Sequence, residues 1–232
     1  MSRPKSSYTL WILGHVLRGL IALVIIGVCA LLIWRVAFSQ KPPKELRRIG
    51  SNEILREALS EYGDDLTILE QPNQIAYTEA GHNAAYFRYD WCVFIKQANQ
   101  VQLLFFYNNS TLEKVQSDYE LGHELPSGEE VFNVLLTQYV DITPEGHEGD
   151  AVLDKREIAP SSCEVGTNRN GMYTFLRYTF DGVDLTDTVV VYLDVFYEEI
   201  EGSLGTLRLY HEEDLSEERD LTRKEKKIIR EG

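Results

Sequence analysis

A long apolar stretch near the start of the chain constrains the protein more than any other feature. Residues 19–38 read GLIALVIIGVCALLIWRVAF and contain one charged side chain, Arg35. A helix rises about 1.5 Å per residue, so this stretch extends roughly 30 Å, the thickness of the hydrocarbon core of a bilayer. We therefore predict a single transmembrane helix, residues 19–38, in contact with the lipid bilayer. Residues 1–18 form a short N-terminal tail with the pattern of an interfacial helix.

A cleaved signal peptide is the first alternative to a permanent anchor. Ala37-Phe38-Ser39 fits a small-x-small cleavage site loosely. However, the apolar run is longer than a usual signal core, and Arg35 beside the site is unusual there. The pattern favours an uncleaved signal-anchor.

The orientation of this anchor depends on the charges at its two ends, which nearly balance. Charge alone slightly favours a cytoplasmic domain. The short N-terminal tail and a sheet-rich domain with two cysteines are instead typical of export. We predict an extracytoplasmic domain, with a cytoplasm-facing one as the alternative. The flanking basic residues are Arg3, Lys5 and Arg18 before the span, and Arg35, Lys41, Lys44, Arg47 and Arg48 at its exit and after it.

Charge is distributed very unevenly along the chain. The whole chain has a net charge of −14, whereas residues 1–48 carry +7 and the remainder −21. A net charge of this sign repels nucleic acid and anionic headgroups, so no nucleic-acid partner is expected and the domain should stand off from the bilayer. Solubility alone explains such an acidic surface, although basic proteins or metal ions would also be attracted to it.

Three cysteines are present, and Cys29 lies inside the predicted span. Cys92 and Cys163 are candidates for one disulfide, which on the chain-entropy model would stabilise the domain by about 4 kcal/mol. Two unpaired buried thiols are the alternative.

After the span, the chain reads as a linker, one soluble domain and a tail. Residues 39–50 form a basic linker that contains Pro42 and Pro43, and residues 212–232 form a charged tail with the pattern of a solvated helix. Residues 51–211 form the domain, which opens with a helix over 51–62 that ends at Gly63.

Within the domain the apolar period changes to two, which is typical of half-buried strands. Ser110 and Glu113 predict a capping box for a short helix between strands. The fold class is therefore mainly β with flanking helices: an antiparallel β-sandwich or a curved antiparallel sheet follows the transmembrane helix. The predicted strands are 85–97, 101–107, 131–142, 171–180, 188–198 and 203–210.

Motifs for catalysis are weak. The chain has no nucleophile elbow, phosphate loop or dinucleotide fingerprint, and no cofactor is expected. Oxygen and nitrogen ligands in loops give two candidate metal clusters, although exposed loop residues and turn formers explain both. The candidates are His123, His147, Glu148 and Asp150 in one set, and Asp181, Asp184 and Asp187 in the other.

These observations favour a non-catalytic interaction or envelope-assembly domain that binds a protein partner. Tyrosine accounts for 13 residues, and an exposed cluster of tyrosines would suit recognition, although most of them alternate into strand faces. A membrane-surface hydrolase or metal-dependent enzyme, and a cytoplasm-facing adaptor, are the alternatives.

Overall fold

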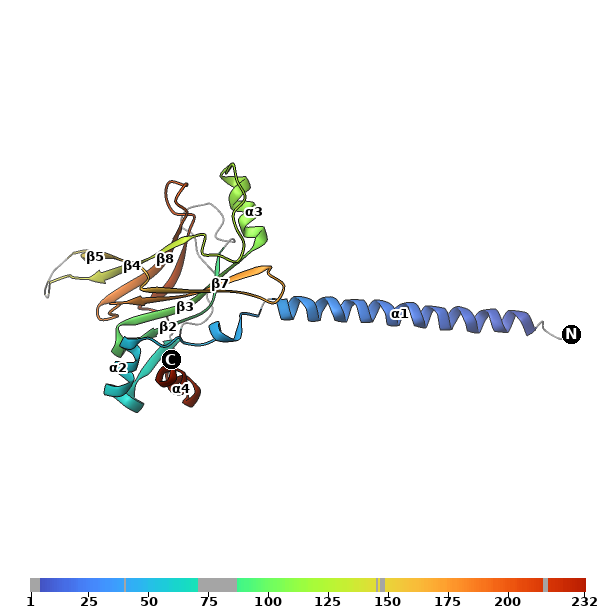
Figure 1. Ribbon diagram of the computed structural model, residues 1–232, viewed down its shortest axis with the longest axis horizontal. Helices are drawn as coiled ribbons and strands as arrows, with labels where there is room; N and C mark the ends of the chain where they lie inside the picture. Colours follow the sequence, from blue (N-terminus) through green and yellow to red (C-terminus); the bar gives the residue numbers. More distant parts are fainter. Residues whose placement is uncertain (1–4, 40, 71–86, 145, 147–148, 215–216) are drawn as a thin grey trace. The chain divides into compact units, whose positions relative to one another are not determined.

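The computed structural model describes residues 5–39, 41–70, 87–144, 146, 149–214 and 217–232. The chain divides into two compact units, Met1–Lys41 and Pro42–Gly232. The first unit contains helix α1 (Lys5–Ser39), in which His15–Ile33 is long and apolar enough to cross a membrane (Figure 1). No proline interrupts α1 after Lys5, so the expected interfacial helix is continuous with the apolar segment.

The second unit is mainly β, as predicted, and its two antiparallel sheets make it a sandwich. In the described residues, the strand order is β10-β1-β2-β3-β7-β6 in the six-stranded sheet and β5-β4-β8-β9 in the four-stranded sheet. The strands are β1 (Thr67–Glu70), β2 (Arg88–Ile95), β3 (Gln100–Asn108), β4 (Asn133–Asp141), β5 (Leu153–Ile158), β6 (Ser162–Thr167), β7 (Tyr173–Asp181), β8 (Thr188–Phe196), β9 (Gly205–His211) and β10 (Glu217–Asp220).

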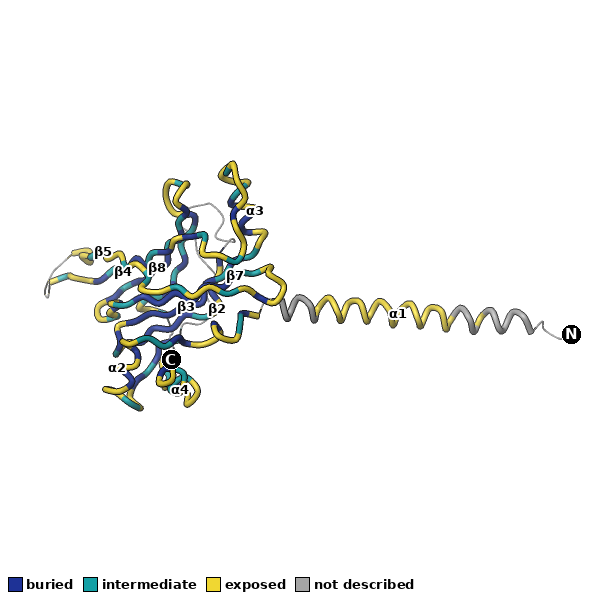
Figure 2. The backbone as a smooth tube through the Cα atoms, viewed as in Figure 1, coloured by how far each residue is buried: buried dark blue, intermediate teal, exposed yellow. Residues whose placement is uncertain are grey.

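The main core lies between the two sheets, where the inward side chains of β2, β3 and β7 meet those of β4, β8 and β9. Figure 2 shows buried segments along β2, β3 and β8. Phe132 is 1% exposed and makes edge contacts with the rings of Phe87 and Tyr107. Such aromatic pairs add about 0.5–1.5 kcal/mol each to the area that they bury. The strand predicted over 188–198 is confirmed as β8, and Val191, Leu193 and Val195 form its inner face.

A second layer covers the outer face of the six-stranded sheet. It consists of α2 (Glu53–Tyr62), α4 (Arg223–Glu231) and the segment 42–50. The sequence predicts a spacer over 39–50, but Leu46 and Ile49 are buried against the sheet. Their apolar side chains are the physical reason that this segment belongs to the domain.

Arg177 on β7 holds this segment in place. Its side chain is 8% exposed, and its guanidinium donates hydrogen bonds of 2.8 Å to the backbone carbonyls of Glu45 and Arg48. It also forms an ion pair of 2.5 Å with Glu164 on β6. A buried guanidinium needs such acceptors, so the segment and the arginine depend on each other.

The C-terminal residues 212–232 are part of the fold, and not only a tail. β10 pairs with β1 along its whole length, and Ile229 of α4 is fully buried beside Leu55 and Leu59. Thr222 and Glu225 form a reciprocal capping box that starts α4. Their pairing explains why this charged sequence is an ordered helix.

Local sequence signals set several boundaries. α2 ends at Gly63, whose φ of +58° is easily reached only without a side chain. The helix α3 (Asn109–Asp118) begins earlier than predicted, because Asn108 and not Ser110 is the N-cap and accepts from the amide of Thr111. The six strands located from the sequence correspond to β2, β3, β4, β7, β8 and β9. The pattern did not locate β1, β5, β6 and β10, which are short or largely exposed.

Candidate functional site

The outer face of the four-stranded sheet carries apolar side chains that belong to none of the three described core clusters. Opposed pairs in the register place these side chains on one face, because neighbours across antiparallel strands point the same way. We call this surface the Tyr139–Tyr192 face. Its apolar members are Leu135 and Tyr139 on β4, and Val190, Tyr192 and Phe196 on β8.

The two tyrosines that name the face lie on neighbouring strands and contact each other edge to face. Their ring centroids are 6.1 Å apart, with 85° between the planes, and both residues are half-buried. A half-buried tyrosine offers a large apolar surface with little rotamer freedom to lose, which suits it to protein interfaces.

A carboxylate, Asp194, lies on the same face among these apolar side chains. One oxygen accepts a hydrogen bond of 2.7 Å from the hydroxyl of Thr137 on β4, and the other accepts one of 2.6 Å from Thr206 on β9. These two bonds fix the carboxylate across three strands. A carboxylate oxygen can accept more than one hydrogen bond, so Asp194 can also receive a guanidinium or ammonium group.

Ion pairs flank the face on both sides. On β5, the ammonium of Lys155 lies 2.6 Å from Glu157, and this hydrogen bond raises the pKa of the lysine. On β9, Arg208 lies 3.3 Å from Asp214. The face therefore has an aromatic centre and a charged rim, an arrangement typical of protein interfaces.

His123 and Asp150, which the sequence places in one metal cluster, lie at opposite ends of the four-stranded sheet. The His123 imidazole is 3.0 Å from the hydroxyl of Tyr197, which directly follows β8. The last residue of β8 pairs with the first residue of β4, so His123 lies at the end of the sheet where β4 begins. Asp150 lies in the connection between β4 and β5. Strand β4 has 9 residues, so about 30 Å separates the two ends. His147 and Glu148 lie outside the described residues.

The second set of acidic residues acts in turns and backbone contacts. Asp181 accepts a hydrogen bond of 2.7 Å from Gln100, and Asp184 accepts one of 2.9 Å from the amide of Thr186, which lowers the pKa of the Asp184 carboxyl. Asp187 has a φ of +55°, and its carbonyl accepts from the amide of Asp141. Within the described ranges, no three His, Cys, Asp or Glu residues gather as metal ligands would.

Of the two alternatives for Cys92 and Cys163, the structure has the unpaired thiols, since both cysteines are free. Cys92 pairs with Leu103, Leu103 with Tyr178, and Tyr178 with Cys163, so two strands lie between the cysteines. Three strand spacings separate the Cα atoms by about 14 Å, and a disulfide requires less than about 7 Å. Burial raises the pKa of the Cys163 thiol to about 12, which makes it a poor nucleophile.

No protein-family model matches the chain, and no curated protein matches it either.

The residues at the centre of the Tyr139–Tyr192 face were not singled out from the sequence. A signal was present, because the positions that alternate with the inner face of β8 hold Val190, Tyr192 and Phe196. A strand that is apolar on both faces has a second apolar surface to cover. Asp194 interrupts that pattern, and its threonine partners depend on the pairing of three strands.

Proposed function

We propose that this protein is a single-pass, membrane-anchored, non-catalytic binding domain, and that a protein partner binds its Tyr139–Tyr192 face. The observation that carries the proposal is the fixed Asp194 carboxylate among half-buried aromatic side chains outside the described core clusters. α1 supports the anchoring by its length and apolar composition.

The partner chemistry follows from the charge and shape of this face. A flat sheet face with two tyrosines, a phenylalanine and one central carboxylate suits an arginine or lysine flanked by apolar side chains. Residues 49–222 carry a net charge of −24, which steers a basic partner toward the domain. The partner is thus a protein with a basic, partly apolar surface.

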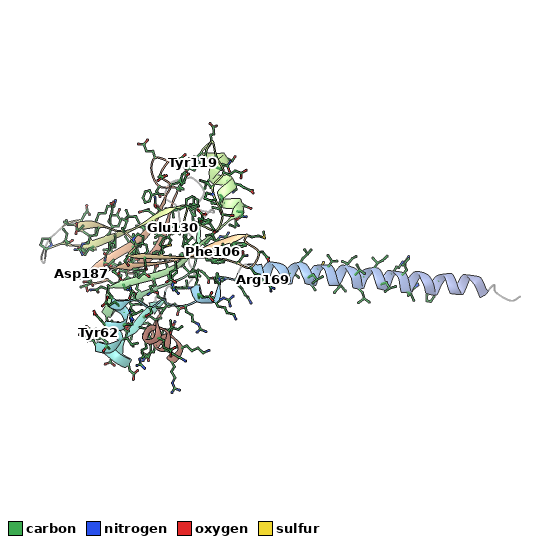
Figure 3. All side chains as sticks on the ribbon, viewed as in Figure 1. Tyr62, Phe106, Tyr119, Glu130, Arg169 and Asp187 are labelled. Atoms are coloured by element: carbon green, nitrogen blue, oxygen red, sulfur yellow. The ribbon has the colours of Figure 1, made fainter. Side chains whose placement is uncertain are left out.

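Site-specific photocrosslinking in native membranes tests this proposal. A benzophenone amino acid replaces Tyr139 or Tyr192 in the full-length chain. Tyr62 and Tyr119 provide matched controls, because they are 40% and 37% exposed and neither lies on a strand of the four-stranded sheet. Tyr62 is the last residue of α2, and Tyr119 follows α3 directly (Figure 3).

We expect an adduct of one defined mass from positions 139 and 192, no such adduct from positions 62 and 119, and its loss on Asp194→Arg. Equal adducts from all four positions, or an adduct that Asp194→Arg leaves unchanged, would contradict the proposed face.

The side of the membrane on which the domain lies is a separate part of the proposal. The sequence favours an extracytoplasmic domain in the cell envelope. A cytoplasm-facing adaptor is the second candidate. It is supported by the basic residues after the span and by the free Cys92 and Cys163, which need no oxidising compartment.

Labelling of intact cells separates the two orientations. Ser127 is exposed, so a Ser127→Cys variant accepts a membrane-impermeant maleimide. An extracytoplasmic domain is labelled before lysis, and a cytoplasmic domain only after lysis. The native Cys163 is a poor probe because its thiol is half-buried with a raised pKa.

A further inference from the structure

Two segments of the layer that covers the outer face of the six-stranded sheet are basic, whereas α2 in the same layer carries Glu53, Glu57 and Glu61 against Arg56. Residues 41–48 and residues 223–231 each carry a net charge of +3, whereas residues 49–222 carry −24. The first segment follows α1 directly, and the second is α4. The fold brings these two segments to the same side of one sheet.

Specific contacts join the two basic segments, although they are far apart in the sequence. The hydroxyl of Ser51 donates a hydrogen bond of 2.8 Å to the carbonyl of Ile229, 178 positions away. Ile49 and Ile229 belong to the same buried cluster. Arg177 holds the carbonyls of Glu45 and Arg48 on the sheet, so the exposed side chains between them are carried on a fixed backbone.

The basic side chains of this layer are exposed. Ile229 is fully buried, and the helical spacing of 100° per residue places Lys224 and Lys227 on the opposite side of α4. Lys227 has a side chain that is 70% exposed. We call the exposed set the basic surface: Lys44, Arg47, Arg48, Arg223, Lys224, Lys227 and Arg230.

Acidic groups neutralise only part of the basic surface. Lys227 has an exposed partner, Glu231, at 3.7 Å. Arg47 donates to the carbonyl of Pro42 and interacts electrostatically with Asp90, and Arg230 interacts with Asp64. In the described part of the chain, Lys44, Arg48 and Lys224 form no ion pair. Solvent-facing cations without protein counter-charges are available to an external anion.

We propose that the basic surface docks on the anionic headgroups of the membrane that α1 anchors, an inference that rests on the proposed anchoring. Lys44 follows the last residue of α1, Ser39, by five positions, so the chain holds it within roughly 18 Å of that end. Each lysine or arginine near an anionic bilayer strengthens binding about fivefold.

Lysine footprinting of the full-length protein in nanodiscs tests the docking. Acetylation rates are measured by mass spectrometry in discs of phosphatidylcholine alone and in discs with 30% phosphatidylglycerol. We expect at least a threefold slower reaction at Lys44, Lys224 and Lys227 in the anionic discs, and recovery in 0.5 M NaCl because salt screens exposed charges. Lys155 on β5 is the internal control and keeps its rate.

A charge-reversal variant separates docking from a general effect of the anionic surface. Lys224→Glu with Lys227→Glu should return the rate at Lys44 to its value in phosphatidylcholine. The matched control, Lys155→Glu with Arg156→Glu on β5, should leave the slow rate at Lys44 unchanged. If the reversed chain fails to fold, the lipid and salt series on the native chain still decides.

Two results overturn the inference in different ways. An inserted protein with the same rates in both kinds of disc, or with an equal loss at Lys155, contradicts docking and leaves the anchoring intact. A protein that does not copurify with the discs contradicts the anchoring itself and removes the premise of the docking.

Discussion

Arg177→Met is expected to release the segment 42–50 from the six-stranded sheet. The substitution removes two hydrogen bonds from a buried guanidinium to the carbonyls of Glu45 and Arg48. Bonds that involve a charged group contribute about 1.5–3 kcal/mol each. The buried Nε of Arg177 has no hydrogen-bond partner among the described atoms. Its burial costs free energy in the native protein, and the substitution removes this cost, which offsets part of the loss. We expect a net cost of about 3 kcal/mol for the docked segment.

Hydrogen–deuterium exchange of the full-length protein measures this cost locally. The amide of Gly50 donates a hydrogen bond of 2.7 Å to the side chain of Gln102, and the amide of Leu46 donates to the carbonyl of Pro43. A loss of about 3 kcal/mol accelerates their exchange roughly 100-fold, because 1.4 kcal/mol is a factor of ten. Amides in β8 should exchange as in the native protein.

Glu164→Gln is the matched control for this prediction. Glu164 has a side chain that is 52% exposed, so its ion pair with Arg177 contributes at most about 1 kcal/mol. We expect less than about a fivefold change in exchange at Leu46 and Gly50. If Arg177→Met and Glu164→Gln have equal effects, the backbone carbonyls are not what holds the segment, and the reasoning is refuted.

Three further predictions test the core, the C-terminal helix and the thiols. Leu193→Ala on the inner face of β8 should destabilise the domain by about 2–5 kcal/mol in denaturant unfolding, and Tyr192→Ala on the outer face by far less, so similar losses would contradict the assigned faces. Burial alone would raise the pKa of the Glu225 carboxyl, but hydrogen bonds from Arg219 and Thr222 outweigh it and lower that pKa. This stabilisation of α4 is therefore present above the unfolded pKa and is lost as pH falls through the folded one. The protection of the α4 amides, measured as their exchange rate relative to the unfolded chain at the same pH, should fall on acidification, and should fall less in Glu225→Gln. A mild oxidant should leave Cys92 and Cys163 unbridged, which alkylation of the denatured chain and mass spectrometry will show; one intramolecular disulfide would contradict the strand register.

The sequence predicts those elements whose pattern is local. The alternation in 188–198 and the helix that ends at Gly63 both agree with the structure. A strand with one buried face shows alternating apolar residues in its sequence, and a positive φ at the end of a helix favours glycine. β5 reads LDKREI and lies exposed at a sheet edge, so no apolar period marks it. β10 reads EERD and is recognisable only through its pairing with β1.

The candidate site shows the same limit. The apolar outer positions of β8 can be read from the sequence, whereas the bonds of Asp194 to Thr137 and Thr206 depend on the register of three strands. The state of the two cysteines was left open for the same reason, since two intervening strands cannot be seen in the spacing of Cys92 and Cys163. Net charge has a similar limit, because it is a sum over the chain and does not show that residues 41–48 and 223–231 are basic segments brought to one sheet by the fold.

The pairing of β1 with β10 has a consequence for how the polypeptide matures. Thr67 lies opposite Asp220, so β1 and β10 can pair fully only after residue 220 has left the ribosome. Contacts this distant along a chain form slowly, because a long loop must close first. A nascent chain interrupted before position 217 would leave β1 without this neighbour, and an unprotected strand edge invites aggregation. The protection of β1 therefore depends on the four residues of β10.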